Sequence, residues 1–406
     1  MNEPVVESES LAQAPPRKLY LSVCATAFSA YASYSLVRTP VLPLYARHLG
    51  LSTEWVGLVV AASTVTGIFL KLPAGTLSDV FGRRRMLFIG ALVFALAPFF
   101  YLLPHNATSL IVVRLIHGSA TAIFGPVKAA VISDLAPAQR RGSWLGTYAA
   151  SQGAGNAAGQ LLGGVLLSVG GFMYPFLTGG LCGVLALALL PRVKGSPTSK
   201  GSAPALVRLR SSLTLILSDR MILLISLATA GQYLGNGVLN AFLPLYADQA
   251  AGLPAWQIGL LFGAQTGSLL AFRPLLGKLS DRLGRPPLMV AGMLASASGL
   301  LILPFLRTFA GLIALAVMYG AAFAATSATS LAWITDRATR SSYGTAHGAY
   351  GTIFDVGDAS GPIAAGLLIG SIGYGAGFRI LAIPLLLLSA LLASRAWSRG
   401  DGPFSS

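Results

Sequence analysis

The chain has 406 residues, of which 54% are hydrophobic and only 10% are charged. Soluble domains carry about 25% charged residues, so this composition excludes an ordinary water-soluble fold. The net charge of +15 could mark a nucleic-acid-binding protein, but the positions of the basic residues along the chain favour a membrane topology signal instead, and no nucleic-acid partner is expected.

Apolar segments long enough to cross a hydrocarbon core of about 30 Å recur along the chain. If the N-terminus is cytoplasmic, the basic residues of the loops gather on the cytoplasmic side, and only Arg47, Arg307 and Arg379 fall on the opposite side. The positive-inside rule then predicts a multi-pass protein of the cell inner (plasma) membrane with both termini in the cytoplasm. The twelve predicted spans lie near residues 18–46, 53–77, 86–104, 107–133, 142–169, 172–191, 221–247, 255–277, 286–306, 308–334, 344–371 and 374–396.

The ends and the middle of the chain differ from the spans in composition. The first sixteen residues carry three Glu and no basic residue, unlike a signal peptide, so we expect the first span to be retained. Residues 192–217 are rich in Lys, Arg, Ser, Gly and Pro, which is typical of a flexible linker. The predicted organisation is a cytoplasmic tail (1–17), a six-helix bundle (18–191), a cytoplasmic linker (192–217), a second six-helix bundle (218–396) and a cytoplasmic tail (397–406).

The two predicted bundles are copies of one sequence pattern. The pentapeptide Leu-Pro-Leu-Tyr-Ala at 42–46 recurs at 243–247, an offset of 201 that becomes 202 after one inserted residue. At that offset Gly75 matches Gly277 and Asp79 matches Asp281. Because the offset spans six helices, an even number, both copies have the same orientation in the membrane, and we predict an all-α fold of two parallel-related bundles.

The loop after the second span contains the pattern Gly-x-Leu-x-Asp-x-x-Gly-Arg at 75–83, and the equivalent loop of the second half contains it again at 277–285. This pattern resembles the signature of the major facilitator superfamily of membrane transporters, and the resemblance covers essentially residues 18–396. It implies the major facilitator fold, and it implies that this loop latches the two halves during the change between outward and inward states. The alternative is a plain cytoplasmic turn. The residues to which the resemblance assigns this gating role are Gly75, Asp79, Gly82, Arg83, Gly277, Asp281, Gly284 and Arg285.

The fourth span carries Arg114, His117 and Gly118, which resembles the family's R-x-x-x-G pattern. The resemblance implies that Arg114 takes part in proton transfer. A charge inside a membrane is costly unless it is paired or hydrated, which also favours a functional role. The alternatives are an Arg114 that reaches lipid headgroups and a His117 that only bonds one helix to another.

The fifth span resembles the family's export-associated pattern g-x-x-x-G-P-x-x-G-G, with Gln160 where antiporters have Pro. The second copy, in the eleventh span, does carry the Pro. Small residues at this spacing let helices pack closely, in a moving transporter or in a static bundle. The residues assigned to this motif are Gly155, Gly159, Gly163, Gly164, Gly361 and Pro362.

Asp355 and Asp358 are the only acidic residues well inside a predicted span, and they lie three residues apart on one face of the eleventh. Asp355 lies about eleven residues from the cytoplasmic end, which places it near the middle of the membrane at about 1.5 Å per residue. Intramembrane acids often carry protons, so we favour Asp355 as the proton site and keep Asp358 beside it. A permanent structural pair with a buried base is the alternative.

In the resembled fold, the first, fourth, seventh and tenth spans line a central cavity. Arg38 and Arg114 would then give the N-terminal half a positive lining that attracts anions. The seventh span offers amide side chains instead of charge. The full candidate cavity set is Arg38, Arg114, His117, Gln232, Asn236 and Asn240, and the substrate class stays open.

These observations predict a secondary active transporter, with proton-coupled efflux of a small amphipathic or anionic compound by alternating access. Uptake or exchange of an anionic metabolite and a lipid flippase on the same scaffold are the alternatives. No metal cluster, nucleophile–base pair or phosphate loop is apparent, so we expect no enzyme activity, no metal and no cofactor. The expected partners are a small-molecule substrate, protons and the lipid bilayer, with the chain acting as a monomer.

Overall fold

The computed structural model describes residues 17–136, 140–190, 219–337 and 343–397, and every regular element in these ranges is a helix. The predicted tails, except Arg17 and Trp397, and the whole predicted linker 192–217 lie outside the described residues. The helices are α1 (Arg17–Arg38), α2 (Val41–His48), α3 (Thr53–Phe81), α4 (Arg83–Phe100), α5 (Ala107–Leu135), α6 (Arg141–Gly170), α7 (Met173–Ala188), α9 (Arg220–Gln249), α10 (Ala255–Leu283), α11 (Arg285–Ile302), the 3₁₀ helix η2 (Leu303–Phe305), α12 (Phe309–Arg337) and α13 (Tyr343–Trp397).

Proline and glycine decide where several helices break. The first predicted span, 18–46, is two helices, because Pro40 separates α1 from α2. The long α13 is two helices joined at Gly373, whose φ of 77° is readily adopted only by glycine. Gly82 and Gly284, at equivalent places in the sequence repeat, both have φ of 88° and connect α3 to α4 and α10 to α11. The glycine at the turn therefore has a similar conformation in both copies.

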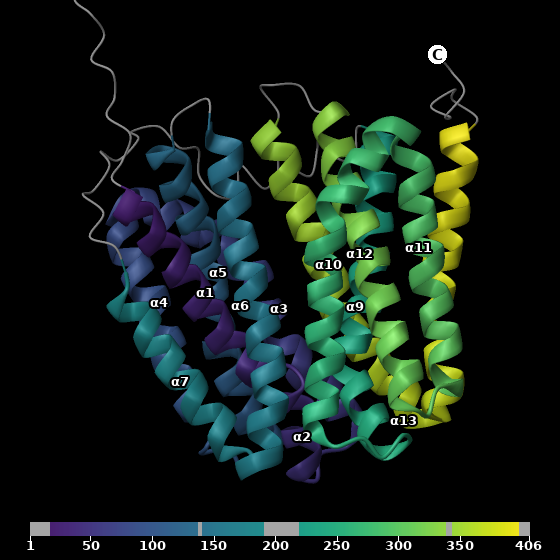
Figure 1. Ribbon diagram of the computed structural model, residues 1–406, viewed down its shortest axis with the longest axis horizontal. Coiled ribbons are helices and arrows are strands. Elements are labelled where there is room, and N and C mark those ends of the chain that lie inside the picture. The colour runs from purple at the N-terminus through teal and green to yellow at the C-terminus, as the bar shows by residue number, and fades with distance from the viewer. Residues whose placement is uncertain (1–16, 137–139, 191–218, 338–342, 398–406) are drawn as a thin grey trace, which may run out of the picture.

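The helices lie roughly parallel in two groups that stand side by side in Figure 1. We call α1–α7 the N-terminal helices and α9–α13 the C-terminal helices. In the first group α1 packs on α6 and α7, and α3 packs on α5; in the second α9 packs on α13, and α10 packs on α12. The two groups meet where α6 contacts α10 and where α3 contacts α13. The first residues of α1 and the last of α13 lie at the same end of the molecule (Figure 1).

Close helix contacts depend on glycines of the predicted export motif. A Cβ at Gly155, Gly159 or Gly163 of α6 would lie 2.4–2.7 Å from a carbonyl oxygen of α1, and one at Gly361 of α13 would lie 2.2 Å from the carbonyl oxygen of Leu234 on α9. These distances leave no room for a side chain, so the helix backbones touch. Gly164 faces the other group of helices, because a Cβ there would lie 2.4 Å from the carbonyl oxygen of Ala255 at the start of α10.

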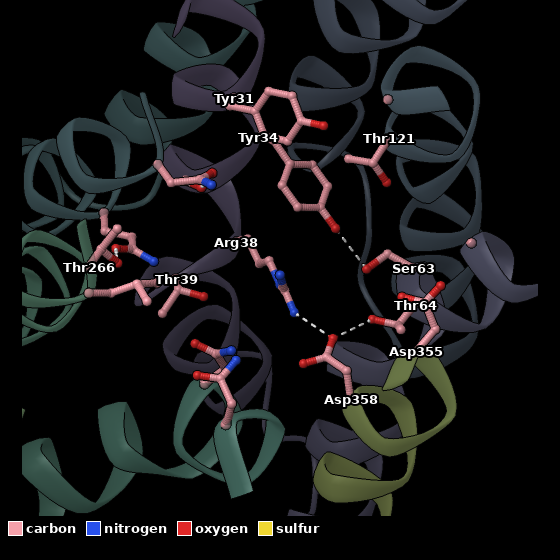
Figure 2. Close-up of a pocket in the computed structure, with 18 of the residues that line it drawn as sticks. Tyr31, Tyr34, Arg38, Thr39, Ser63, Thr64, Thr121, Thr266, Asp355 and Asp358 are labelled. Atoms are coloured by element: carbon pink, nitrogen blue, oxygen red, sulfur yellow. Dashed lines mark hydrogen bonds and ion pairs between the residues drawn. The ribbon is translucent and has the colours of Figure 1, made fainter. Parts of the chain in front are cut away.

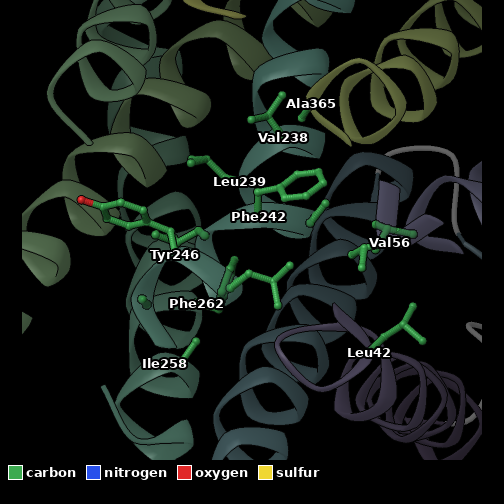
Figure 3. Packing of buried hydrophobic residues seen from close by; sticks show 14 of the residues in the cluster. Leu42, Val56, Val238, Leu239, Phe242, Tyr246, Ile258, Phe262 and Ala365 are labelled. Atoms are coloured by element: carbon green, nitrogen blue, oxygen red, sulfur yellow. The ribbon is translucent and has the colours of Figure 1, made fainter. Parts of the chain in front are cut away.

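A large apolar cluster joins the two groups at the end of the molecule that carries α2 (Figures 1 and 3). Leu42 of α2 and Val56 of α3 belong to the same buried cluster as Phe242 of α9, Phe262 of α10 and Ala365 of α13. These side chains are all at most 1% exposed, so water is excluded between the groups at this end. We call this set the inter-group apolar cluster.

Six helical stretches among the described residues are long and apolar enough to cross a membrane by length and composition. They are Thr53–Lys71, Ala107–Lys128, Arg220–Gln249, Arg285–Phe305, Phe309–Arg337 and Tyr350–Arg395, the last of which runs across the break at Gly373. Large apolar side chains also cover the outer surface: Phe69, Val169 and Leu387 are 71%, 76% and 65% exposed. Such a surface suits a lipid environment better than water.

Candidate functional site

A cavity of about 450 Å³ lies between the two groups of helices. Its wall is built from α1, α3, α5 and α6 on one side and from α9, α10, α12 and α13 on the other (Figure 2). Most of the lining residues are polar, and four of them are charged: Arg38, Lys71, Asp355 and Asp358. The two bases come from the N-terminal helices and the two acids from the C-terminal helices, so each group contributes one sign of charge.

Arg38 and Asp358 form the first ion pair across the cavity. Arg38 Nη2, near the end of α1, lies 3.4 Å from Asp358 Oδ2 on α13. Thr64 Oγ1 on α3 donates a hydrogen bond to the same carboxylate oxygen at 3.0 Å. Figure 2 shows all three side chains converging on one point of the cavity. The Asp358 carboxylate is therefore held by two N-terminal helices at once.

Lys71 and Asp355 form the second ion pair, about one helical turn away along α13. Lys71 Nζ lies 2.5 Å from Asp355 Oδ2 and 5.7 Å from the centre of the Phe354 ring. The Asp355 side chain is only 8% exposed, whereas that of Lys71 is 38% exposed. A buried carboxylate is stabilised by such a partner, because its charge would otherwise lack compensation.

Arg114 is fully buried and is not part of the cavity wall. Its guanidinium donates to the carbonyl oxygens of Val59 and Val60, each at 3.3 Å, and to Ser63 Oγ. Its charge meets hydroxyls and carbonyls, and no carboxylate among the described residues pairs with it. Ser63 lines the cavity and also accepts a hydrogen bond from Tyr34, so Arg114 lies directly behind the wall.

The other predicted cavity residues divide into two sets. Asn236 and Asn240 line the cavity, and Asn236 Oδ1 accepts a hydrogen bond from Gln265 at 3.3 Å. His117 and Gln232 are fully buried inside their own groups and do not line it. His117 Nδ1 lies 3.2 Å from the Tyr101 hydroxyl, and Gln232 Nε2 donates to Ser296 Oγ at 2.7 Å.

Sequence reasoning did not single out several residues that the cavity brings together. One of them is Lys71, whose ammonium group turns inward to Asp355 of α13. Gln160, noted only as the replacement for a Pro, accepts a hydrogen bond from Thr266 of α10 at 2.7 Å and so joins the two groups. Tyr31, Tyr34 and Asn156 also line the cavity. Nothing in the sequence distinguishes these three residues from other polar or aromatic residues of the same predicted spans.

Arg285 of the second copy of the repeated loop makes two ion pairs. Arg285 bonds Asp281 on α10, and its Nε lies 2.9 Å from Asp336 Oδ2 on α12, so this Arg joins helices within the C-terminal group. Gly284 supplies the turn between α10 and α11. Gly277 has open space around it, as does Gly82 in the first copy. In the first copy, Gly75 and Asp79 lie in the last turns of α3, and Arg83 begins α4.

The described residues contain no group of three His, Cys, Asp or Glu side chains placed to hold a metal ion. Cys24 and Cys182 are both unpaired. The chemistry of the cavity is thus that of two inter-group ion pairs surrounded by amides, hydroxyls and tyrosines.

Comparison with known proteins gives a consistent result. A family model described as Major Facilitator Superfamily matches residues 23–264 and 225–403. An uncharacterized MFS-type transporter from Methanocaldococcus jannaschii is 24% identical over 350 residues, which cover 85% of this chain and 89% of that protein. The quinolone resistance protein NorA from Staphylococcus aureus is 31% identical over 164 residues, which cover 39% of this chain and only 42% of NorA.

Solved structures of similar fold cover nearly the whole chain. The nucleoside transporter NupG and the peptide transporter POT in complex with sulfate each have a TM-score of 0.78 at 15% identity. The matches cover 93% and 95% of this chain, and 99% and 95% of those chains. A bacterial homologue of the human lysosomal transporter Spinster, solved in an inward-facing and unoccupied conformation, has a TM-score of 0.76 at 15% identity and covers 96% of this chain and 99% of its own. At these identities the likeness concerns the fold.

Proposed function

The chain belongs to the Major Facilitator Superfamily, and from this premise we propose that it is a secondary active transporter that exports a small amphipathic or anionic compound in exchange for protons. Members of this superfamily are transporters and not enzymes, as the sequence predicts. The finer topology belongs to the proposal: twelve spans in two six-helix bundles, 18–191 and 218–396, joined by the cytoplasmic linker 192–217. The tails 1–17 and 397–406 are then cytoplasmic, and the protein is a monomer of the plasma membrane.

The observation that carries the proposal is the Lys71–Asp355 pair, which joins the two groups of helices across the cavity. A proton on Asp355 removes its negative charge, and the attraction between α3 and α13 at this point is lost. The closed and open arrangements of the two groups then differ in energy by an amount that depends on protonation, which is the requirement for coupling. Asp358, held by Arg38 and Thr64, is a second such position.

Two further observations support alternating access. The inter-group apolar cluster closes the end of the molecule that carries α2, while the cavity lies between the groups beyond it. Arg114 lies against Ser63 in the cavity wall, where a buried positive charge influences which groups nearby can carry a proton. The gating role of the loops at Asp79, Arg83, Asp281 and Arg285 belongs to the same proposal.

Export is favoured over uptake by two lines of support. NorA, a quinolone resistance protein, is 31% identical over the matched part of the chain. The glycines of the export-associated motif in α6 and α13 lie where they allow close contact between helix backbones.

Uptake of an anion is the second candidate, and the Arg38–Asp358 pair favours it. An anionic substrate on Arg38 displaces Asp358 from the guanidinium, which leaves a carboxylate with only Thr64 as its described hydrogen-bond partner. The carboxylate has then lost its compensating charge, and a proton carried with the substrate would replace that charge. Substrate and proton would then move in the same direction, as a symport.

The experiment that tests the proposal follows accumulation of anionic, neutral and cationic compounds in bacteria that lack their main exporters and express this chain. We expect the wild type to lower accumulation of some compounds, and a protonophore to abolish the effect. Asp355→Asn should abolish proton-driven export, because its side chain cannot be ionised. Asp248→Asn, which changes an exposed acid outside the cavity, is the matched control.

Two outcomes contradict the proposal. Protonophore-sensitive accumulation of an anion by the cells would establish uptake, with Arg38 as the residue that binds the anion. Export that persists in Asp355→Asn with full protonophore sensitivity would remove Asp355 from the coupling mechanism.

A further inference from the structure

The hydroxyl of Ser63 on α3 has a hydrogen that the chain does not use. The Ser63 oxygen accepts a hydrogen bond from the Tyr34 hydroxyl at 3.0 Å and another from Arg114 Nη2. A hydroxyl has two lone pairs and one hydrogen, so both acceptor positions are filled and the hydrogen remains to be donated. Among the described residues, no acceptor bonds this hydrogen.

The acceptor that a serine inside a helix commonly uses is already bonded. Such a hydroxyl often donates to the carbonyl oxygen four residues earlier. Thr66 of the same helix does so, with the carbonyl oxygen of Ala62 at 3.1 Å. For Ser63 the equivalent oxygen is that of Val59, which instead accepts from Arg114 Nε at 3.3 Å. Arg114 therefore bonds both the Ser63 oxygen and the acceptor that Ser63 would ordinarily use.

The unused hydrogen lies at the cavity wall. Ser63 and Tyr34 both line the cavity, and Figure 2 shows the Ser63 oxygen at the edge of the space in front of the Arg38 guanidinium. Arg38 Nε likewise has no hydrogen-bond partner among the described residues. Two donors of the wall, one on α3 and one on α1, are thus left without an acceptor.

Positive charge exceeds negative charge at this part of the wall. The guanidinium carbons of Arg38 and Arg114 each lie 5.8 Å from the centre of the Tyr34 ring. Asp358 pairs with Arg38, but no carboxylate within the described ranges pairs with Arg114. Two cations therefore face one anion, and a ligand with a single negative charge would balance them.

We propose that Ser63 donates this hydrogen to a carboxylate of the transported compound. Arg114 is a positioning residue, which holds the Ser63 oxygen from behind and adds a positive charge. The proposal rests on the proposed transport function and names its substrate class, an aromatic carboxylate. A carboxylate accepts several hydrogen bonds, so it can bind Ser63 and Arg38 together. Tyr31 and Phe323 in the same lining offer rings to the aromatic body.

The test is equilibrium dialysis of the purified full chain, in a neutral detergent near neutral pH, against 1-naphthoate and separately against 1-naphthamide. The two probes have similar shapes, but only the first is charged. We expect the wild type to bind 1-naphthoate more tightly. Ser63→Ala should weaken 1-naphthoate binding by about 10- to 100-fold and 1-naphthamide binding by only about 5-fold, because a hydrogen bond to a charged group is the stronger one.

The remaining charge and two further variants separate this role from others. Arg114 keeps its charge in Ser63→Ala, so attraction by charge alone would preserve the preference for 1-naphthoate. Ser63→Thr retains the hydroxyl and should retain the preference. Thr66→Val removes a hydroxyl of α3 that does not line the cavity, and it should also retain the preference.

Several results would overturn the proposal. They are a wild type that binds 1-naphthoate no more tightly than 1-naphthamide, an unchanged preference in Ser63→Ala, and an equal loss of both probes in that variant, which a purely structural role of Ser63 predicts. Loss of the preference in Ser63→Thr or in Thr66→Val would overturn it as well. Dialysis needs no proton gradient, so a failure of proton-driven export in cells would contradict the proposed function and leave this binding result unaffected.

Discussion

At the scale of single residues, the Lys71–Asp355 pair predicts a measurable cost for removing one partner. Lys71→Met leaves the Asp355 carboxylate, which is 8% exposed, without its cation. Breaking a buried pair costs about 3–5 kcal/mol, but Lys71 is 38% exposed and water screens part of the effect, so we expect a loss of about 1–2 kcal/mol. Thermal unfolding of the purified protein in detergent measures this loss.

The companion of this variant is Lys71→Met/Asp355→Asn, in which neither side chain is charged. It should recover most of the stability that Lys71→Met loses, while proton-driven transport stays absent. Equal stability of the single and double variants would mean that Lys71 and Asp355 do not interact energetically.

The residues of the cavity were only partly predictable from the sequence. Asp355, Asp358 and Arg38 were singled out because a charge inside an apolar span is rare and costly. Lys71 was not, because its distance from the end of its span is short enough for the ammonium group to reach the headgroups. Its partner lies 284 residues away in the sequence, and no local spacing indicates a pair over such a separation.

At the scale of helices, the contact of α6 with α10 predicts that closure needs glycine at Gly164. A Cβ there would lie 2.4 Å from the Ala255 carbonyl oxygen and 2.7 Å from Gly259 Cα, both backbone atoms. Gly164→Val should therefore separate the helices at the end that carries α2, at a cost of about 1–3 kcal/mol to the closed arrangement. We expect normal expression, loss of transport and faster labelling of Asn240→Cys by a maleimide added from that side.

Gly267→Val is the matched control, because this position on α10 has no atom within 4 Å of a Cβ. It should leave labelling and transport close to wild type. Loss of transport in both variants to the same extent would show that valine disturbs α10 in general and would refute the specific role of Gly164.

Helix positions were predicted more completely than helix breaks. Hydropathy and the repeat placed the segments that became α3 to α7 and α9 to α12, and the loop pattern placed Gly82 and Gly284 at turns. The prediction of one helix over 18–46 was wrong, because Pro40 interrupts it, and the sequence already carried that signal.

At the scale of the whole molecule, transport should require the two groups to separate at the end that carries α2. Trp256 N of α10 donates to Ser168 Oγ of α6 at 2.8 Å, and both side chains are exposed. In a variant with Cys24 and Cys182 replaced by Ser, we expect a short bifunctional thiosulfonate to join Ser168→Cys and Trp256→Cys and to stop transport. A reductant should restore it.

Single-cysteine variants treated with the same reagent are the controls, and they should keep their activity. Transport that continues in the fully cross-linked double variant would contradict alternating access at this end. The sequence could predict the parallel repeat and the family fold, but not which end is closed, because every state of a transporter has the same sequence.

The Lys71–Asp355 pair also determines how the membrane potential acts on the proposed cycle. With Asp355 ionised the pair has no net charge, and with Asp355 protonated it carries one positive charge. A charge that crosses the field gains about 2.3 kcal/mol for each 100 mV, so voltage would drive only the proton-loaded half of the cycle. Exchange of a neutral compound for one proton is then electrogenic, and it should accelerate in vesicles whose interior is negative even when no pH gradient is present.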